Sequence, residues 1–455
     1  MASTGASMQK RGGSRVPSTG RLVILHKANR YPTTRLEQLL LMAAIVLIPL
    51  EDHIPAVAGY SIMFLCFGVL AGYVLLYRPG IVAHTWGHSI FLIGYALIVL
   101  ATLIESSRPY TNYGEIFRIG QMIVGGVLVA SLCRDRQALQ SCMYGYLIAG
   151  LWLSILLFLT TYGALQGAVA TDFQEASLVR AKVFEEQALH VNLNRMAFFT
   201  AQGAVVGLVL ALTASSPLLR NLFFGLTGLC IVASFLPLSR SGIVTVVVAC
   251  ATVTFVYGVT AGRKHFNRFV RTILFAIGLG ACILIWVPNS VFSRLEFSTQ
   301  TKPGEEMEAR AHLYTAALEH LPEYVVTGIG VGNYWESWGR RHGFGAHDGG
   351  VYGAHSSLIQ ATIYWGLIGL LPLLGVIYQA YRCLPKRCGV DVLSLCLLGV
   401  SVSLLLYMMV THVLAFKGFS IGLGILVGAR LWIWPQGIVQ PTAQLRIYPS
   451  VIRDR

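Results

Sequence analysis

The chain has 455 residues, of which 55% are hydrophobic and only 12% are charged. Soluble domains carry about 25% charged residues, so this composition excludes a soluble globular protein and indicates one that spans a membrane many times. The net charge is +14. Most lysines and arginines lie in segments expected to stay inside, so the charge indicates orientation and contact with anionic lipid rather than with nucleic acid.

A membrane-spanning helix needs about 20 apolar residues, and about twelve segments approach that length. In chain order they are 37–50, 54–77, 88–104, 114–132, 142–162, 195–214, 220–238, 240–260, 270–288, 354–381, 389–410 and 413–434. Lysine and arginine placement puts both termini in the cytoplasm and the loops near 163–194 and 288–353 outside. We therefore predict an all-α integral membrane protein of about twelve transmembrane helices, with one large periplasmic loop that contains amphipathic helices.

The same pattern divides the chain into three parts. Residues 1–36 are basic, rich in glycine and serine, and predict a disordered cytoplasmic tail rather than a cleaved signal. Residues 37–434 form the polytopic membrane domain, and 435–455 form a second cytoplasmic tail.

The polar segment 288–353 interrupts the series of apolar spans and gives room for water-accessible chemistry. Within it, residues 305–321 have helical periodicity and an acidic start that suits the helix dipole. Tyr314 lies on the apolar face of this predicted helix, and Arg310 falls in the middle of that face. A guanidinium there needs an acidic partner or a bound anion, unless it snorkels to the lipid headgroups.

The run from Thr327 to Gly332 contains alternate glycines. A dinucleotide fingerprint would need a strand before the run and a helix after it, so a tight turn with close backbone approach is the better interpretation. His342, His347 and His355 fit no standard ligand spacing, and no carboxylate triad accompanies them, so we expect no metal.

His355 stands at the start of an apolar segment, beside Ser356. A neutral imidazole there can act as general base on a hydroxyl near neutral pH, although a histidine at a helix start is, taken alone, more often a cap or an interface residue. Arg240 is placed between two apolar spans, where an unpaired charge costs at least about 2.5 kcal/mol. Arg195 enters the span that precedes them and is expected to face the same site.

These arginines and the histidine are expected at the outer leaflet, without the acidic pair of a glycosidase. Arginines suit diphosphates because they form bidentate hydrogen bonds. The residues therefore predict displacement of a lipid diphosphate by an acceptor hydroxyl, in which His355 takes the proton while Arg240 and Arg310 hold the departing phosphates. A polytopic lipid or polysaccharide transporter is the competing class, and it would distribute charges through the bilayer midplane.

Three segments resemble the O-antigen ligase and polymerase family of bacterial membrane glycosyltransferases. They are Arg310-Ala-His-Leu-Tyr-Thr-Ala-Ala-Leu, Thr327-Gly-Ile-Gly-Val-Gly-Asn-Tyr and Ala354-His-Ser-Ser-Leu-Ile-Gln-Ala-Thr-Ile-Tyr-Trp-Gly-Leu. Weaker similarity at Ser239-Arg240-Ser241-Gly242 and Asn192-Leu-Asn-Arg-Met-Ala extends the similar region to 190–372. One departure is Ser356, where the family usually has Asn.

The resemblance implies a bacterial inner-membrane enzyme with a periplasmic active site that uses undecaprenyl-diphosphate-linked glycans without metal, nucleotide or other cofactor. It assigns diphosphate contacts to Arg240 and Arg310 and the general base to His355. Candidate acceptor contacts are Tyr314, His347 and Ser356. A ligase would transfer the glycan to lipid A–core, a polymerase to another lipid-linked unit, and some relatives to protein; the basic outer rim favours a ligase.

Overall fold

The computed structural model describes most of the membrane domain. The described residues are 32–50, 62–88, 113–162, 193–237, 239–260, 266–287, 317–331, 356–381, 391–411 and 416–433, with the single positions 94, 97, 100, 314, 315 and 414. The helices discussed below belong to one compact unit, Thr33–Arg455. Most of the predicted loop 288–353, with Arg310 and His347, lies outside the described residues, as do His355 and nearly all of both predicted tails.

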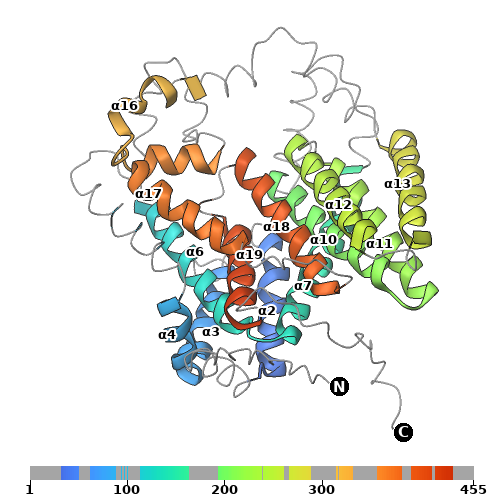
Figure 1. Cartoon of the computed structure of the whole chain (residues 1–455), viewed down its shortest axis with the longest axis horizontal. Coiled ribbons are helices and arrows are strands. Elements are labelled where there is room, and N and C mark those ends of the chain that lie inside the picture. Colours follow the sequence, from blue (N-terminus) through green and yellow to red (C-terminus); the bar gives the residue numbers. More distant parts are fainter. Residues whose placement is uncertain are drawn as a thin grey trace, which may run out of the picture. The chain divides into compact units, whose positions relative to one another are not determined.

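Every regular element in the described ranges is helical, which agrees with the predicted all-α class. The helices are α2 (Arg35–Leu47), α3 (Ile62–Tyr77), α4 (Pro79–His88), α6 (Tyr113–Leu132), α7 (Arg136–Leu157), α10 (Leu193–Thr213), α11 (Pro217–Phe235), α12 (Arg240–Thr260), α13 (Phe266–Trp286), α16 (Leu321–Tyr324), α17 (Ser357–Tyr381), α18 (Val392–Val410) and α19 (Lys417–Gly428). Short turns of 3₁₀ or π helix extend three of them: Ile48–Leu50, Phe158–Tyr162 and Ala429–Ile433. Figure 1 shows their arrangement.

Eight of the described helices are long and apolar enough to cross a membrane. They are α6, α7, α10, α11, α12, α13, α17 and α18. Helices α3 and α4 meet at an angle of 104°. If this bent pair is counted as one span, the number of spans among the described helices rises to nine. The chain is therefore a multi-pass membrane protein. The total of about twelve spans and the periplasmic loop stay predictions.

Helix α10 forms the centre of the described bundle, and 89% of its spanning window is buried. It packs against α7, α11, α12 and α18. Glycines permit this close approach: a Cβ atom on Gly150 of α7 would lie 2.6 Å from the Cα of Gly203 in α10. Small residues at helix crossings are the usual route to tight packing in membranes, where apolar surface alone does not drive association.

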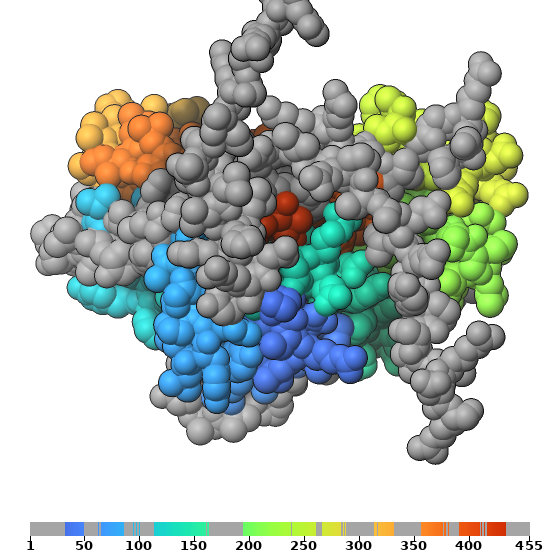
Figure 2. All heavy atoms as spheres, turned by 60° about the horizontal axis from the view of Figure 1, so that its bottom comes forward, coloured from blue at the N-terminus to red at the C-terminus, as the bar shows by residue number. Residues whose placement is uncertain are grey.

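Buried ion pairs tie several helices together at one end of the bundle. Glu37 in α2 is fully buried and accepts hydrogen bonds from Arg134 at 2.8 Å and Arg78 at 3.2 Å. Arg136 of α7 pairs with Asp391, the N-cap of α18. These contacts join α2, α7 and α18 to the break between α3 and α4, and Figure 2 shows α2 beside α3 and α4 in blue. The sequence places this end in the cytoplasm.

Candidate functional site

The opposite end of the bundle brings two of the predicted arginines to neighbouring helix starts. Arg195 lies in the first turn of α10, and Arg240 is the first residue of α12. The two starts are joined because Ser239 donates a hydrogen bond from Oγ to Oδ1 of Asn194 at 2.7 Å. The same Ser239 Oγ accepts from the backbone N–H of Gly242 at 3.2 Å, which caps α12. The hydrogen-bonded cap therefore fixes Arg240 relative to Arg195.

Close packing keeps the two helices at this spacing. A Cβ atom on Gly242 would lie 2.2 Å from the Cβ of Ala197 on α10. Only a glycine fits at that crossing, which explains in physical terms why Gly242 follows Ser239-Arg240-Ser241. The sequence predicted this turn with little room for a loop, and α11 and α12 are indeed separated by only four residues, 236–239.

A cluster of aromatic rings packs against Arg195. Its Cζ lies 5.3 Å from the centroid of the Phe416 ring, which gives a cation–π contact. Phe198, Tyr407 and Phe416 pack against one another, with ring centroids 4.7–5.7 Å apart. These residues come from α10, α18 and the N-cap of α19. The arginine is therefore positioned by three elements that are far apart in the sequence.

A third cation, Lys417, stands at this end as the first residue of α19. Arg195, Arg240 and Lys417 each occupy the first turn of a helix, where the macrodipole disfavours positive charge. The described first turns of α10, α12, α17 and α19 contain no acidic residue. This concentration of positive charge makes the end suited to an anionic group.

The start of α17 is held at the same end. Ser357 is fully buried and donates a hydrogen bond from Oγ to the backbone carbonyl of Thr411, at the end of α18, at 2.7 Å. Ser356 is 6% exposed, and its carbonyl accepts from Gln360 N–H at 2.9 Å. His355 lies outside the described residues, but the backbone of the next residue is fixed.

Helix α17 is broken at Gly366, where φ is 61° and ψ is −156°. The predicted span 354–381 is helical from Ser357 to Tyr381, but the sequence did not indicate this break inside it. In a continuous helix the carbonyls of Ile363 and Tyr364 would accept from the N–H groups of Leu367 and Ile368. The segment 325–330 takes over both roles, and Figure 1 shows the two parts of α17 meeting at an angle.

Four backbone hydrogen bonds make this exchange. Ile329 and Gly330 donate to the carbonyls of residues 363 and 364, at 2.8 and 3.0 Å. Leu367 and Ile368 donate to the carbonyls of residues 325 and 326, at 2.7 and 3.3 Å. All four donors and acceptors freed by the break are thus paired again, as a low-dielectric environment requires.

The predicted tight turn at the alternate glycines is confirmed for the described part of the run. Gly328 and Gly330 have φ values of 75° and 87°. A Cβ atom on Gly328 would lie 2.2 Å from the carbonyl oxygen of Tyr364, so the glycine allows the backbone to reach α17. The run serves as a backbone clamp rather than as a strand-to-helix phosphate loop.

The end of the predicted outer helix docks onto the same part of α17. Described residues 314, 315 and 317–319 are helical, and α16 follows. Ala317 and Tyr324 are buried together with Ile363, Tyr364 and Trp365. Burial raises the pKa of Tyr324 to about 12, so its hydroxyl stays protonated and donates to the Ala317 carbonyl. Tyr314 is half-buried next to this contact, on the helix that contains Arg310 in the prediction.

A partly buried acidic contact links α17 to α6. The hydroxyl of Tyr364 donates to the carboxylate of Glu115, 3.1 Å from each oxygen. The sequence did not indicate Tyr364 as a partner of Glu115. The contact fixes the first half of α17 two residues before Gly366, where the helix breaks.

Lys417 is the site residue that the sequence interpretation missed. It lies inside the predicted span 413–434, and an ionisable residue within an apolar span is by itself a signal of function. The structure also leaves three candidates untested, because Arg310, His347 and His355 lie outside the described residues. It brings Arg195 and Arg240 together and places Ser356 and Ser357 at the same end.

Residues 222–374 match the family model described as O-Antigen ligase. This third of the chain is therefore similar to the O-antigen ligase family. The resemblance inferred from the motifs is thereby confirmed, and the matched region runs from α11 into α17. It includes Arg240 and Gly366, whereas Arg195 and Lys417 lie outside it. The match supports a membrane enzyme of the O-antigen ligase or polymerase type in general, with lipid-linked glycans as the general class of substrate. No curated protein matches the chain.

Proposed function

We propose that the protein is an O-antigen ligase that transfers a glycan from undecaprenyl diphosphate to a hydroxyl of lipid A–core at the periplasmic face of the inner membrane. The observation that carries the proposal is the concentration of Arg195, Arg240 and Lys417 in first turns of helices without acidic residues. A diphosphate leaving group would offset this unfavourable positive charge. The favoured acceptor follows from the basic character of the same end.

The proposed reaction is a single displacement. The acceptor oxygen bonds to the anomeric carbon, the bond from that carbon to the diphosphate oxygen breaks, and undecaprenyl diphosphate leaves with the electron pair. His355 takes the acceptor proton, while Arg240 and Arg310 stabilise the charge that develops on the departing diphosphate. Arg195 would assist from α10. Tyr314, His347 and Ser356 are the proposed acceptor-side residues, and no metal or nucleotide takes part.

A reconstitution tests the proposal. Purified full-length protein is mixed with undecaprenyl-diphosphate-linked glycan and lipid A–core, with chelator and without nucleotide. Wild type should place glycan on lipid A–core, and His355→Ala should not. Arg240→Lys should lower transfer at least about tenfold, because an ammonium cannot form the bidentate contact.

Arg271 provides the matched control. It is exposed on α13, whose first residues lie near the end that the sequence places in the cytoplasm. Arg271→Lys should therefore transfer glycan like wild type. Longer lipid-linked chains in place of glycosylated lipid A–core would make the enzyme a polymerase. No transfer to either acceptor by well-folded protein would contradict the proposal.

A further inference from the structure

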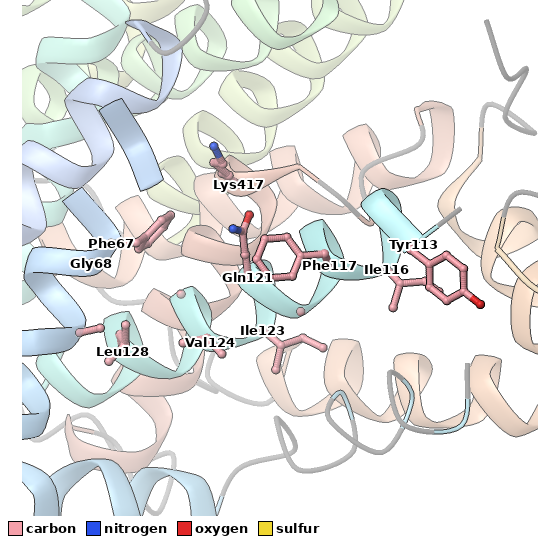
Figure 3. A pocket seen from close by; sticks show the side chains of 13 residues that line it. Phe67, Gly68, Tyr113, Ile116, Phe117, Gln121, Ile123, Val124, Leu128 and Lys417 are labelled. Carbon is pink, nitrogen blue, oxygen red and sulfur yellow. The ribbon is translucent and has the colours of Figure 1, made fainter. Parts of the chain in front are cut away.

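A groove of about 520 Å³ runs along one face of α6. Ligand sites typically enclose about 300–1,000 Å³, so the groove can hold part of a lipid. It lies between α6, α3 and the first residue of α19, and Figure 3 shows the side chains that line it. Of its thirteen lining residues, only Tyr113, Gln121 and Lys417 have polar side chains.

The lining residues of α6 follow helical spacing. Tyr113, Phe117, Gln121, Val124 and Leu128 recur every three or four positions, so they share one face of the helix. Fifteen residues separate the first from the last, which corresponds to about 22 Å along the helix. The groove is therefore elongated along the axis of α6, as a lipid chain requires.

The polar groups lie well inside the membrane-spanning length of α6. Helix α19 runs parallel to α6, because Ser420 donates to the Met122 carbonyl and Gly424 packs against Gly126. Lys417 is one turn before Ser420, so it lies close to the level of Gln121. Gln121 itself is eight residues, or about 12 Å, from the start of α6. An ionisable residue within a membrane-spanning region is a functional candidate by default.

We infer that this groove binds a polyprenyl phosphate, with its phosphate at Lys417 and Gln121 and its isoprenoid chain along the deeper, apolar part. That part is formed by Val124, Gly125 and Leu128 of α6 with the α3 residues Phe67 and Ala71. The inference rests on the proposed function, in which the donor carrier is such a lipid. It adds the place where the carrier chain enters the protein.

Depth distinguishes this ligand from a bilayer phospholipid. Phospholipid headgroups lie outside the hydrocarbon core, which is about 30 Å thick and equals the length of α6. Lys417 and Gln121 lie roughly a third of that length inside. A phosphate reaches them only in a lipid drawn into the protein. The amide of Gln121 makes no hydrogen bond within the described part of the chain, so it is available to such a ligand.

The groove lies next to the end of the bundle that carries Arg195 and Arg240, and Phe416 connects the two. Phe416 directly precedes Lys417 and carries Arg195 over its ring. Phe416 contacts Arg195 of α10, whereas Lys417 lines the groove together with α6. The start of α19 thus separates the proposed chain groove from the proposed diphosphate contacts.

Glycines in open space allow a direct test. Gly68 lines the groove, and a Cβ atom there would meet nothing within 4 Å. Gly68→Leu should therefore fill the groove without displacing protein atoms, and leucine is the better helix former. Gly280 is the matched control, since it has the same open space but lines an uncharged apolar groove between α11, α12 and α13. Gly72→Leu is a second control on α3, one turn away and outside the groove.

The measurement is native mass spectrometry of the full-length protein with three probes: undecaprenyl phosphate, uncharged undecaprenol and phosphatidylglycerol. Wild type should retain undecaprenyl phosphate. Gly68→Leu should weaken this binding at least about tenfold, while Gly280→Leu and Gly72→Leu should bind like wild type. Lys417→Gln should reduce undecaprenyl phosphate binding to the level of undecaprenol and leave undecaprenol itself unchanged, and Lys417→Arg should restore binding.

Two results would overturn the inference. One is equal binding by Gly68→Leu and Gly280→Leu. The other is an equal loss of phosphatidylglycerol in Lys417→Gln, which would make the groove a general phospholipid site. Failure of the proposed function is separable, because glycan transfer is assayed independently. Wild-type transfer with unaltered lipid binding in Gly68→Leu would reject the groove alone, whereas selective binding without transfer would reject the ligase assignment alone.

Discussion

Replacing Gly366 by alanine tests whether the break in α17 is a built feature. At φ 61° and ψ −156° the residue occupies a region that is essentially restricted to glycine. An added Cβ atom would lie 2.3 Å from the carbonyl oxygen of Val326. The variant can keep the break under strain, or it can close α17 into a continuous helix and release the segment 325–330.

Both routes are unfavourable by similar amounts. Keeping the break stores about 1–3 kcal/mol of backbone strain, in addition to the displacement of Val326. Closing the helix loses four hydrogen bonds and regains two, and at about 0.5–1.5 kcal/mol each the net loss is about 1–3 kcal/mol. Gly366→Ala should therefore lower the free energy of unfolding by at least about 1–3 kcal/mol and reduce glycan transfer, because the start of α17 would move.

The assay is thermal unfolding of purified protein in detergent together with the transfer reaction. Gly278→Ala is the control, since this α13 glycine is helical and an added Cβ meets nothing within 4 Å. That change should be neutral or stabilise by up to about 1 kcal/mol. Gly328→Ala breaks the same contact from the other side, so the double variant should lose less than the sum of the two single losses. Additive losses, or a Gly366→Ala variant indistinguishable from Gly278→Ala, would refute the reasoning.

Three further predictions concern the ends of the bundle. Glu37→Gln should cost about 3–5 kcal/mol in detergent unfolding, because it leaves the buried guanidinium of Arg134 without its carboxylate; an unchanged melting temperature would contradict this. Ser239→Ala should cost about 1 kcal/mol as a lost helix cap, and it should lower transfer because Arg240 loses its fixed position, whereas normal transfer would show that the cap is only structural. Tyr364→Phe should cost about 0.5–1.5 kcal/mol by removing a donor from the half-buried carboxylate of Glu115, and equal stability of variant and wild type would show that water replaces the hydroxyl.

Hydropathy predicted most of the long described helices because burial in lipid requires long apolar runs, but it did not predict α4 between the spans 54–77 and 88–104. The start of α12 at Arg240 agrees with the predicted span, and α10 and α13 begin within a few residues of their predicted starts. Helix α2 begins at Arg35, two residues early, because Thr34 and Glu37 form a capping box. Such hydrogen-bonded ends depend on local side chains that an average over twenty residues does not register.

The break in α17 escaped prediction because the run around Gly366 is uniformly apolar. Hydropathy measures side chains, whereas the break is a backbone event that depends on a partner segment about forty residues earlier. The sequence did contain the complementary signal in the glycines at 328 and 330, which were interpreted as a turn with close backbone approach. What could not be read from the sequence was the partner that the turn approaches.

These contacts bear on how the proposed catalytic histidine is held. The nine residues after Ser356 are fixed at three places. Ser357 donates to the carbonyl of Thr411, and Tyr364 donates to Glu115. The carbonyls of residues 363 and 364 accept from the backbone N–H groups of residues 329 and 330. Three separate elements thus restrain one short half-helix that begins two residues after His355. General-base catalysis depends on placing the base within hydrogen-bond reach of the attacking hydroxyl, and a loose support costs rate. The broken helix is best understood as a short rigid mount for the segment that carries the histidine, which a continuous span of the same length would aim in a different direction.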